Sequence, residues 1–268
     1  RVQLSYQVTM KYQPETLQKI EVLGHPAFTL GGEGEPILFV AGPPGSAVMW
    51  ENVQRRLAPR RTVAVEFPLM TNGSFEEIAT RLQRIVSQLG SVAVVSHGEA
   101  VPFALSIDAS CVKLQVLTNG LLLGGPEASQ VSKLPRTVIN SVTRLGIGKR
   151  FFSSSFGLRR AVKNPYVMEK SVVDKMIAPY FSTREQRKGM LALFRLASEE
   201  RQVQISAPVH VIWGDSDRMH PKESLEAWAS SLRGVTIEYV PGGRWFYPVE
   251  CPWELADRLT RIVKLRSI

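Results

Sequence analysis

The stretch from Ser91 to Ser106 constrains the fold of this chain more than any other. It begins with the β-branched run Val92-Ala93-Val94-Val95, which is typical of a strand buried on both faces of a parallel sheet. Ser96-His97-Gly98-Glu99-Ala100 then interrupts the apolar pattern, and a helical apolar run starts at Val101. A strand, a sharp turn and a helix in immediate succession predict a tight junction, in which Gly98 tolerates backbone angles that other residues avoid.

Strands and helices alternate along most of the chain. A hairpin is expected over Met10–Leu30, and single strands are expected at Ile37–Val40, Arg61–Glu66, Val112–Leu117, Val209–Trp213 and Thr236–Val240. Helices are expected at Trp50–Leu57, Ser74–Leu89, Lys222–Leu232 and Pro252–Lys264. Ser74 and Glu77 have the spacing of a capping box. This alternation predicts an α/β fold with a mostly parallel, doubly wound sheet.

The pattern changes between Gly124 and Glu200, where only helices are expected. They cover Val138–Leu145, Val172–Tyr180 and Glu185–Glu200. We interpret this stretch as a helical lid, so that residues 1–123 and 201–268 form the core and residues 124–200 form a cap inserted into it. The cap contains 14 Lys/Arg against 6 Asp/Glu, and its balance of +8 is nearly all of the chain's net charge of +9.

Several classes of protein are disfavoured by composition. No apolar run of about 18 residues occurs, so we expect a soluble or peripheral protein without a transmembrane segment. The first residues lack a signal-peptide core, but a start at Arg1 leaves processing and targeting open. Two cysteines do not form a disulfide framework, and four scattered histidines do not form a metal site. No metal or cofactor is expected. No nucleic acid is expected either, because no reading motif accompanies the positive charge.

Five landmarks in the expected order resemble the lidded α/β-hydrolases, the group that includes epoxide hydrolases, haloalkane dehalogenases and carbon–carbon bond hydrolases. They are Gly32-x-Gly34-x-Pro36, Gly42-x-Pro44-Gly45-Ser46, the turn at Gly98, Trp213–Arg218, and Pro241-Gly242 followed by Glu250-x-Pro252. The resemblance implies the α/β-hydrolase fold. It also implies a nucleophile on the turn after the buried strand, with a base, an acid and an oxyanion loop.

The resemblance places the nucleophile at Gly98, which has no side chain to attack with. A register slip to Ser96 is the alternative, but it would place the hydroxyl at the end of the strand. Counting back five residues from Glu250 places the base at Trp245, whose indole has no basic lone pair. A shift by one residue reaches Arg244 or Phe246, and neither is a base. We expect this aromatic stretch to close the pocket.

The oxyanion loop and the acid position give the remaining expectations. The family's histidine is Ala41 here, and the residue that donates its N–H is Pro43, which has none. The second donor would be the N–H of Glu99, whose carboxylate would repel an oxyanion. Asp217 alone keeps its acid, and without a base to orient we expect it to cap the helix near Pro221. His220 is an alternative base, and His97 is expected to pack.

Two classes of function remain open. The first is a non-catalytic relative, a pseudoenzyme that acts as a binding or scaffold subunit, docking on an acidic protein subunit or an anionic membrane surface through its basic cap. The docking candidates are Lys149, Arg150, Phe151, Phe152, Arg159 and Arg160. The second is a non-hydrolytic enzyme (a cyclase, isomerase or lyase) or a carrier that holds a small apolar ligand.

The pocket residues for this second class would be Glu99, His220 and Tyr247, with Asp217 also able to supply acid–base help. For any single pair of basic residues, a merely solvated surface is the simpler interpretation. An open pocket beside Gly98 would favour the enzyme or carrier, whereas a pocket filled by Trp245 would favour the scaffold.

Overall fold

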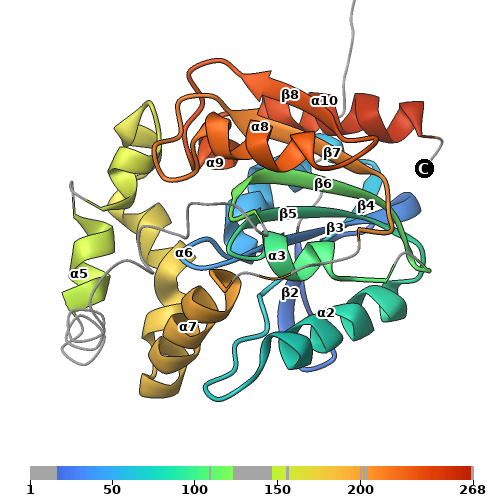
Figure 1. Cartoon of the computed structure of the whole chain (residues 1–268). Coiled ribbons are helices and arrows are strands. Elements are labelled where there is room, and N and C mark those ends of the chain that lie inside the picture. The colour runs from blue at the N-terminus through green and yellow to red at the C-terminus, as the bar shows by residue number, and fades with distance from the viewer. Residues whose placement is uncertain are drawn as a thin grey trace, which may run out of the picture.

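A mostly parallel sheet of eight strands forms the centre of the molecule (Figure 1). The computed structural model describes residues 17–108, 110–122, 147–154, 157–199, 201 and 205–266. The strands lie in the order β1-β2-β4-β3-β5-β6-β7-β8. The pairs β1–β2 and β2–β4 are antiparallel, and the other pairs are parallel. The predicted doubly wound sheet is therefore confirmed. The entry hairpin is present as β1 and β2, and residues 10–16 of the stretch expected for it lie outside the described residues. The strand bounds are β1 Gln18–Val22, β2 His25–Leu30, β3 Glu33–Ala41, β4 Arg60–Val65, β5 Val92–Gly98, β6 Val112–Gly120, β7 Val209–Gly214 and β8 Thr236–Val240.

Helices cover both faces of the sheet because alternate strand residues point to opposite sides. In β5, Ala93 and Val95 join the apolar core beneath α1 (Glu51–Leu57) and α10 (Pro252–Leu265). Val92 and Val94 join the core beneath α2 (Phe75–Leu89) and α3 (Val101–Leu105). The end of the sheet at β7 is covered by α8 (Lys222–Ser230). The predicted capping box of α2 is present, with Ser74 and Glu77 each accepting from the other's backbone N–H.

Between β6 and β7 the described chain is helical, and we call these segments the cap helices. They are α5 (Ile147–Ser153), η2 (Leu158–Ala161), η3 (Pro165–Val167), α6 (Lys170–Phe181) and α7 (Arg184–Ala197). Helices α5, α6 and α7 lie together beside the sheet (Figure 1). Residues 147–154 and 157–199 contain no strand, and the helix expected at Val138–Leu145 lies outside the described residues. None of the described helices has the length and apolar character of a membrane span.

The cap helices share the apolar core of the sheet, so they are packed onto it over a wide area. Met176, Ile177 and Tyr180 of α6 and Phe194 of α7 are buried in the same cluster as Phe39 and Val95. Burial of such side chains contributes about 1.5–3 kcal/mol each relative to exposure. The cap helices therefore belong to the same hydrophobic core as β3 and β5.

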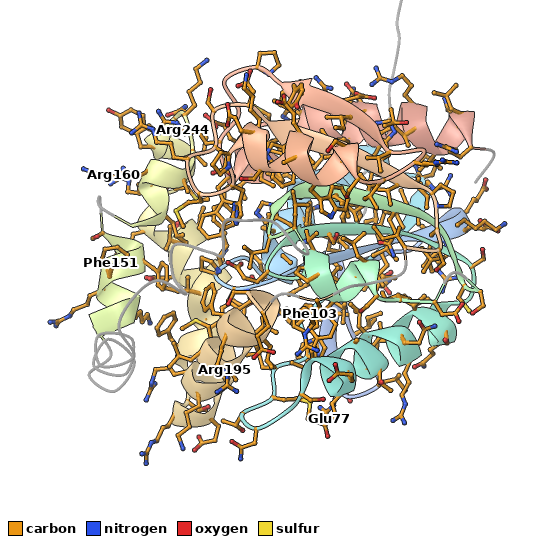
Figure 2. All side chains as sticks on the ribbon, in the orientation of Figure 1. Glu77, Phe103, Phe151, Arg160, Arg195 and Arg244 are labelled. Carbon is orange, nitrogen blue, oxygen red and sulfur yellow. The ribbon has the colours of Figure 1, made fainter. Side chains whose placement is uncertain are left out.

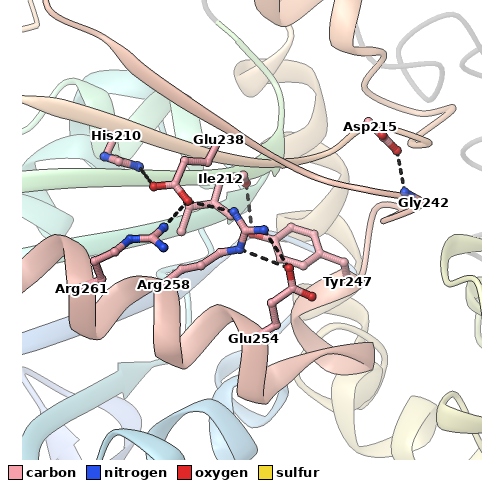
Figure 3. Close-up of polar contacts among 9 residues, drawn as sticks. All are labelled: His210, Ile212, Asp215, Glu238, Gly242, Tyr247, Glu254, Arg258 and Arg261. Carbon is pink, nitrogen blue, oxygen red and sulfur yellow. Dashed lines mark hydrogen bonds and ion pairs between the residues drawn. The ribbon is translucent and has the colours of Figure 1, made fainter.

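The C-terminal helix is tied to the last two strands through Glu238 of β8 (Figure 3). The Glu238 carboxylate accepts from His210 Nε2 at 3.0 Å and pairs with Arg258 at 2.8 Å and Arg261 at 2.6 Å. Ahead of α10, the short helix α9 (Tyr247–Glu250) follows Trp245 and Phe246. The loop after β8 is thus held between the sheet and α10, which fixes where Trp245 points.

Candidate functional site

The turn at the end of β5, which we call the elbow, has glycine at its apex, the position expected for a nucleophile. Gly98 has a φ of 63°, in the left-handed region that costs a side-chain-bearing residue strain. The β3 loop lies directly against the turn, where Gly42 N–H donates to His97 O at 3.0 Å. A Cβ on Gly42 would lie 2.5 Å from Ala100 N, so only glycine fits there. The scaffold of the elbow is intact, and its apex carries no hydroxyl.

Trp245 faces the apex from the loop after β8. A Cβ built on Gly98 would lie 3.8 Å from Trp245 Nε1 and 3.6 Å from Gly42 O. The positions expected for the nucleophile and the base, Gly98 and Trp245, therefore lie opposite each other. Trp245 is buried, and its Nε1 has no acceptor among the described residues. Its ring contacts Phe246, His97 and His220, with centroid distances of 4.8, 6.5 and 5.3 Å.

Asp217 and His220 form a buried hydrogen-bonded pair in the loop after β7. His220 Nδ1 lies 3.1 Å from Asp217 Oδ2, and both side chains are about 95% buried. Asp217 has the expected role in loop structure but does not cap the helix near Pro221, because α8 starts without a side-chain cap bond. Asp217 Oδ1 instead accepts from Met219 N–H at 2.8 Å, since that amide lies in the same turn. Asp217 therefore holds both its own loop and an imidazole.

Asn119, at the end of β6, positions Asp217 and had no role in the sequence analysis. Its Nδ2 donates to Asp217 Oδ2 at 2.9 Å and to Gly214 O at 3.2 Å. Its Oδ1 accepts from Gly214 N–H at 2.7 Å. One side chain thus ties β6 to β7 beyond their last paired residues, Leu117 and Val211. Its position in the sequence could have indicated this role, because it is a polar residue at the carboxyl end of a parallel strand, where functional sites of α/β sheets commonly lie.

The Asp217–His220 pair has the form of an acid–base dyad. A carboxylate that accepts from Nδ1–H leaves Nε2 as the basic nitrogen of a neutral imidazole. This ring packs edge-on against Trp245, beside the apex that lacks a nucleophile. The arrangement can move a proton, but it has no hydroxyl or thiol at Gly98 to activate.

Glu99, the residue after the apex, is a buried carboxyl without a hydrogen-bond partner on Oε2. Burial raises the pKa of Glu99 to about 7, and the nearby His220 partly offsets this rise. Burial also raises the pKa of Glu66, just after β4, to about 7, and its Oε2 likewise has no partner. Both carboxyls influence Tyr180 electrostatically, and burial raises the pKa of that phenol well above its usual value.

His97 is buried among aromatic rings beneath the elbow. Its Nδ1 lies 2.8 Å from Thr118 Oγ1, and that hydroxyl donates to Ser96 O. Since the hydroxyl proton is used there, His97 Nδ1 is the donor and Nε2 keeps its lone pair. That Nε2 is buried without a partner, and burial lowers the pKa of His97 well below 6.5. His97 therefore lies in the structure as a neutral, packed side chain.

The loop that would stabilise an oxyanion is covered by the cap. Ala41 and Pro43 lie buried beside the elbow, and Pro43 presents no N–H. Tyr180 of α6 donates its hydroxyl proton to Gly45 O in this loop. Ser46 Oγ and Trp50 Nε1 are buried nearby, without hydrogen-bond partners in the part of the chain that the structure describes.

Tyr247 does not join the cluster around Gly98, although it was a pocket candidate. Its hydroxyl donates to Ile212 O at 3.0 Å, and its ring lies beside Arg258 and Glu254 (Figure 3). Tyr247 thus secures α9 to β7. The structure brings Glu99, His220 and Asp217 together with Trp245, and it leaves Tyr247 in the core.

The docking candidates lie on two neighbouring segments of the cap, α5 and η2. Lys149, Arg150 and Phe151 are exposed on α5, while Phe152 packs on Phe181 with a centroid distance of 5.7 Å. Arg159 and Arg160 lie on η2, and Arg244 from the loop after β8 donates to the Arg160 carbonyl oxygen. Figure 2 shows Arg160 and Arg244 next to each other on the cap side of the molecule.

Solved structures similar to this one include an esterase, an epoxide hydrolase and a haloalkane dehalogenase. A thermophilic esterase from Thermogutta terrifontis superposes with a TM-score of 0.71 at 17% identity, covering 94% of this chain and 99% of the other. The epoxide hydrolase CorEH superposes with a TM-score of 0.70 at 15% identity, covering 93% of this chain and 98% of the other. The haloalkane dehalogenase DbeA from Bradyrhizobium elkani superposes with a TM-score of 0.69 at 16% identity, covering 94% of this chain and 98% of the other. The chain has the α/β-hydrolase fold. Neither protein-family models nor curated proteins match the sequence.

Proposed function

We propose that this α/β-hydrolase-fold protein works by binding and does not hydrolyse esters, epoxides or carbon–halogen bonds by the route of its fold. The observation that carries the proposal is the apex of the elbow, where Gly98 faces the indole of Trp245. Hydrolysis on this fold needs a nucleophile at the first position and a base at the second. Glycine and tryptophan supply neither.

The surroundings of Gly98 support the same proposal. Pro43 cannot donate to an oxyanion, and burial keeps Trp245, Glu99 and His220 away from solvent. Tyr180 of the cap reaches over the loop that would receive a substrate carbonyl. A site filled by Trp245 and covered by α6 is the arrangement that favours a scaffold over an open catalytic pocket.

Restoring the hydroxyl alone is expected to give no esterase. With either Gly98→Ser or the wild type, p-nitrophenyl acetate should be hydrolysed no faster than in buffer alone. Trp245 cannot take the serine proton, and Pro43 offers no N–H to the oxyanion. Gly98→Ala controls for the strain of a side chain at this φ. Turnover by Gly98→Ser that Gly98→Ser/His220→Gln lacks would make His220 a working base and would overturn the proposal.

The partner of a binding subunit is proposed to be acidic. Lys149, Arg150 and Phe151 present two cations and an aromatic ring that is 52% exposed on one short helix. Desolvated aromatic and basic side chains are common anchors of protein interfaces. We propose an acidic protein subunit as the occupant of this surface, and an anionic membrane is the competing outcome.

Native mass spectrometry of the protein from its own source, gently purified, tests the partner. We expect a stable assembly with an acidic chain, dissociating as ionic strength rises because exposed charges are screened. Binding to anionic vesicles without any protein partner would replace the subunit by a membrane. A bare monomer carrying a small additional mass would contradict the scaffold and support the candidate below.

A second candidate is a small-molecule enzyme or carrier that uses the old site. The observation that favours it is a group of orphaned buried atoms around the elbow: the Trp245 and Trp50 Nε1 donors and the His97 Nε2 and Glu99 Oε2 acceptors. Buried polar groups normally find partners, so these four favour a ligand with both donor and acceptor groups over a purely apolar one. The Asp217–His220 pair would then supply proton transfer without a nucleophile.

A further inference from the structure

The cap and the loop after β8 together form a cationic pocket on the surface. Its volume is about 410 Å³, and four of its seven lining residues are cationic while none is acidic. The cations are Arg159, Arg160 and Lys163 from the cap and Arg244 from the loop, with Tyr166 beside them. Two segments some 80 positions apart in sequence thus contribute charge to one concave site.

Hydrogen bonds to the backbone hold this pocket in shape. Arg244 Nη1 donates to Val162 O at 3.1 Å and to Arg160 O at 3.3 Å, and Arg159 Nε donates to Pro165 O at 3.3 Å. The Glu250 carboxylate accepts from the backbone N–H groups of Lys163 and Asn164 from the opposite side. Guanidinium groups fixed in this way lose less freedom on binding than unrestrained side chains.

Three of the four cations in the pocket lack an ion-pair partner within the described part of the chain. Arg159, Lys163 and Arg244 form no ion pair with any described carboxylate. Cations gathered in one concavity repel one another, and a bound anion relieves that repulsion. The nearby acid, Glu250, is engaged with backbone N–H groups.

We propose that this pocket binds the phosphate group of a small phosphate monoester. Arginine forks match the oxygens of a phosphate in paired hydrogen bonds, and a lysine adds a point charge. The volume fits a small organic molecule rather than a bare ion. The Tyr166 ring, which is 77% exposed, offers a surface for the organic part. The proposal is independent of the site at Gly98 and of the acidic partner.

Calorimetric titration with inorganic phosphate and with phenyl phosphate at constant ionic strength tests the site. We expect saturable 1:1 binding, tighter for phenyl phosphate. Arg159→Gln/Lys163→Gln should weaken it at least about tenfold, since charge-assisted hydrogen bonds are lost. The control Arg184→Gln/Lys188→Gln removes two exposed cations of α7 and should change affinity less than about twofold.

Three further measurements keep the outcome decisive. Lys163→Gln alone removes an exposed side chain and should weaken binding without lowering the melting temperature. Arg159→Lys/Lys163→Arg keeps the charge and should retain most of the affinity. Sedimentation with phosphatidylcholine vesicles containing phosphatidic acid, abolished by the pocket variants, would identify a lipid headgroup as the source of the phosphate. The proposal would be overturned if no saturable binding were seen, or if the α7 control variant lost as much affinity as the pocket variant.

Discussion

Replacing Glu99 by Gln is expected to raise the free energy of unfolding by about 3 kcal/mol at pH 8 and to leave it nearly unchanged near pH 4.5. Burial raises the pKa of this carboxyl from 4.5 to about 7 in the folded protein. Each unit of such a difference corresponds to about 1.4 kcal/mol. Gln has nearly the same shape and is uncharged at every pH, so the variant lacks the cost of a buried carboxylate.

The sign follows from proton binding. Between pH 4.5 and 7 the unfolded chain has lost the Glu99 proton while the folded protein keeps it, so this group makes stability fall as pH rises. His97 acts in the opposite sense, because burial lowers its pKa and stability falls as pH drops below 6.5. The difference between variant and wild type at each pH cancels His97 and isolates Glu99.

Urea unfolding at several pH values from 4.5 to 8 measures this difference. Glu66→Gln should show the same trend, since the pKa of Glu66 is also raised to about 7. Glu223→Gln removes an exposed charge from α8 and should show no trend. If the difference in unfolding free energy between variant and wild type stayed constant across this pH range, the pKa of Glu99 would not be raised in the folded protein. The burial argument would then be wrong.

The architecture was predictable because its signals are local and repeated. β-Branched runs between turn residues located the strands, and the Ser74 and Glu77 spacing located the start of α2. The positive φ of Gly98 was implied by an abrupt change from strand to helix around a glycine. Each of these features depends on neighbours in sequence, so the sequence alone contains the information.

The environment of Asp217 depends on contacts that no sequence period encodes. A spacing of three residues suggests no contact between Asp217 and His220, since the loop between them is irregular. The pairing arises because Asn119, almost one hundred positions earlier, fixes the carboxylate. The cationic pocket is similar, because Arg244 contacts the carbonyl oxygens of Arg160 and Val162, more than 80 positions earlier in the sequence.

Replacing Asn119 by Ala is expected to lower the free energy of unfolding by about 4 kcal/mol. The substitution removes partners from Gly214 N–H, Gly214 O and the Asp217 carboxylate, all in a buried environment. Each orphaned neutral group costs about 1–3 kcal/mol, and a charged one costs more. Asn119→Asp should be at least as harmful, because it sets a second carboxylate against Asp217.

Urea unfolding at pH 7 gives the magnitude, with Asn72→Ala as the matched control on an exposed loop. That control should change stability by less than about 0.5 kcal/mol. The ¹⁵N chemical shifts of His220 add a readout specific to the site. The wild type should show a protonated Nδ1 held by Asp217, and Asn119→Ala should weaken that preference as the carboxylate becomes free to move. A stability loss with unchanged His220 shifts would mean that Asn119 only joins β6 to β7 and does not position the dyad.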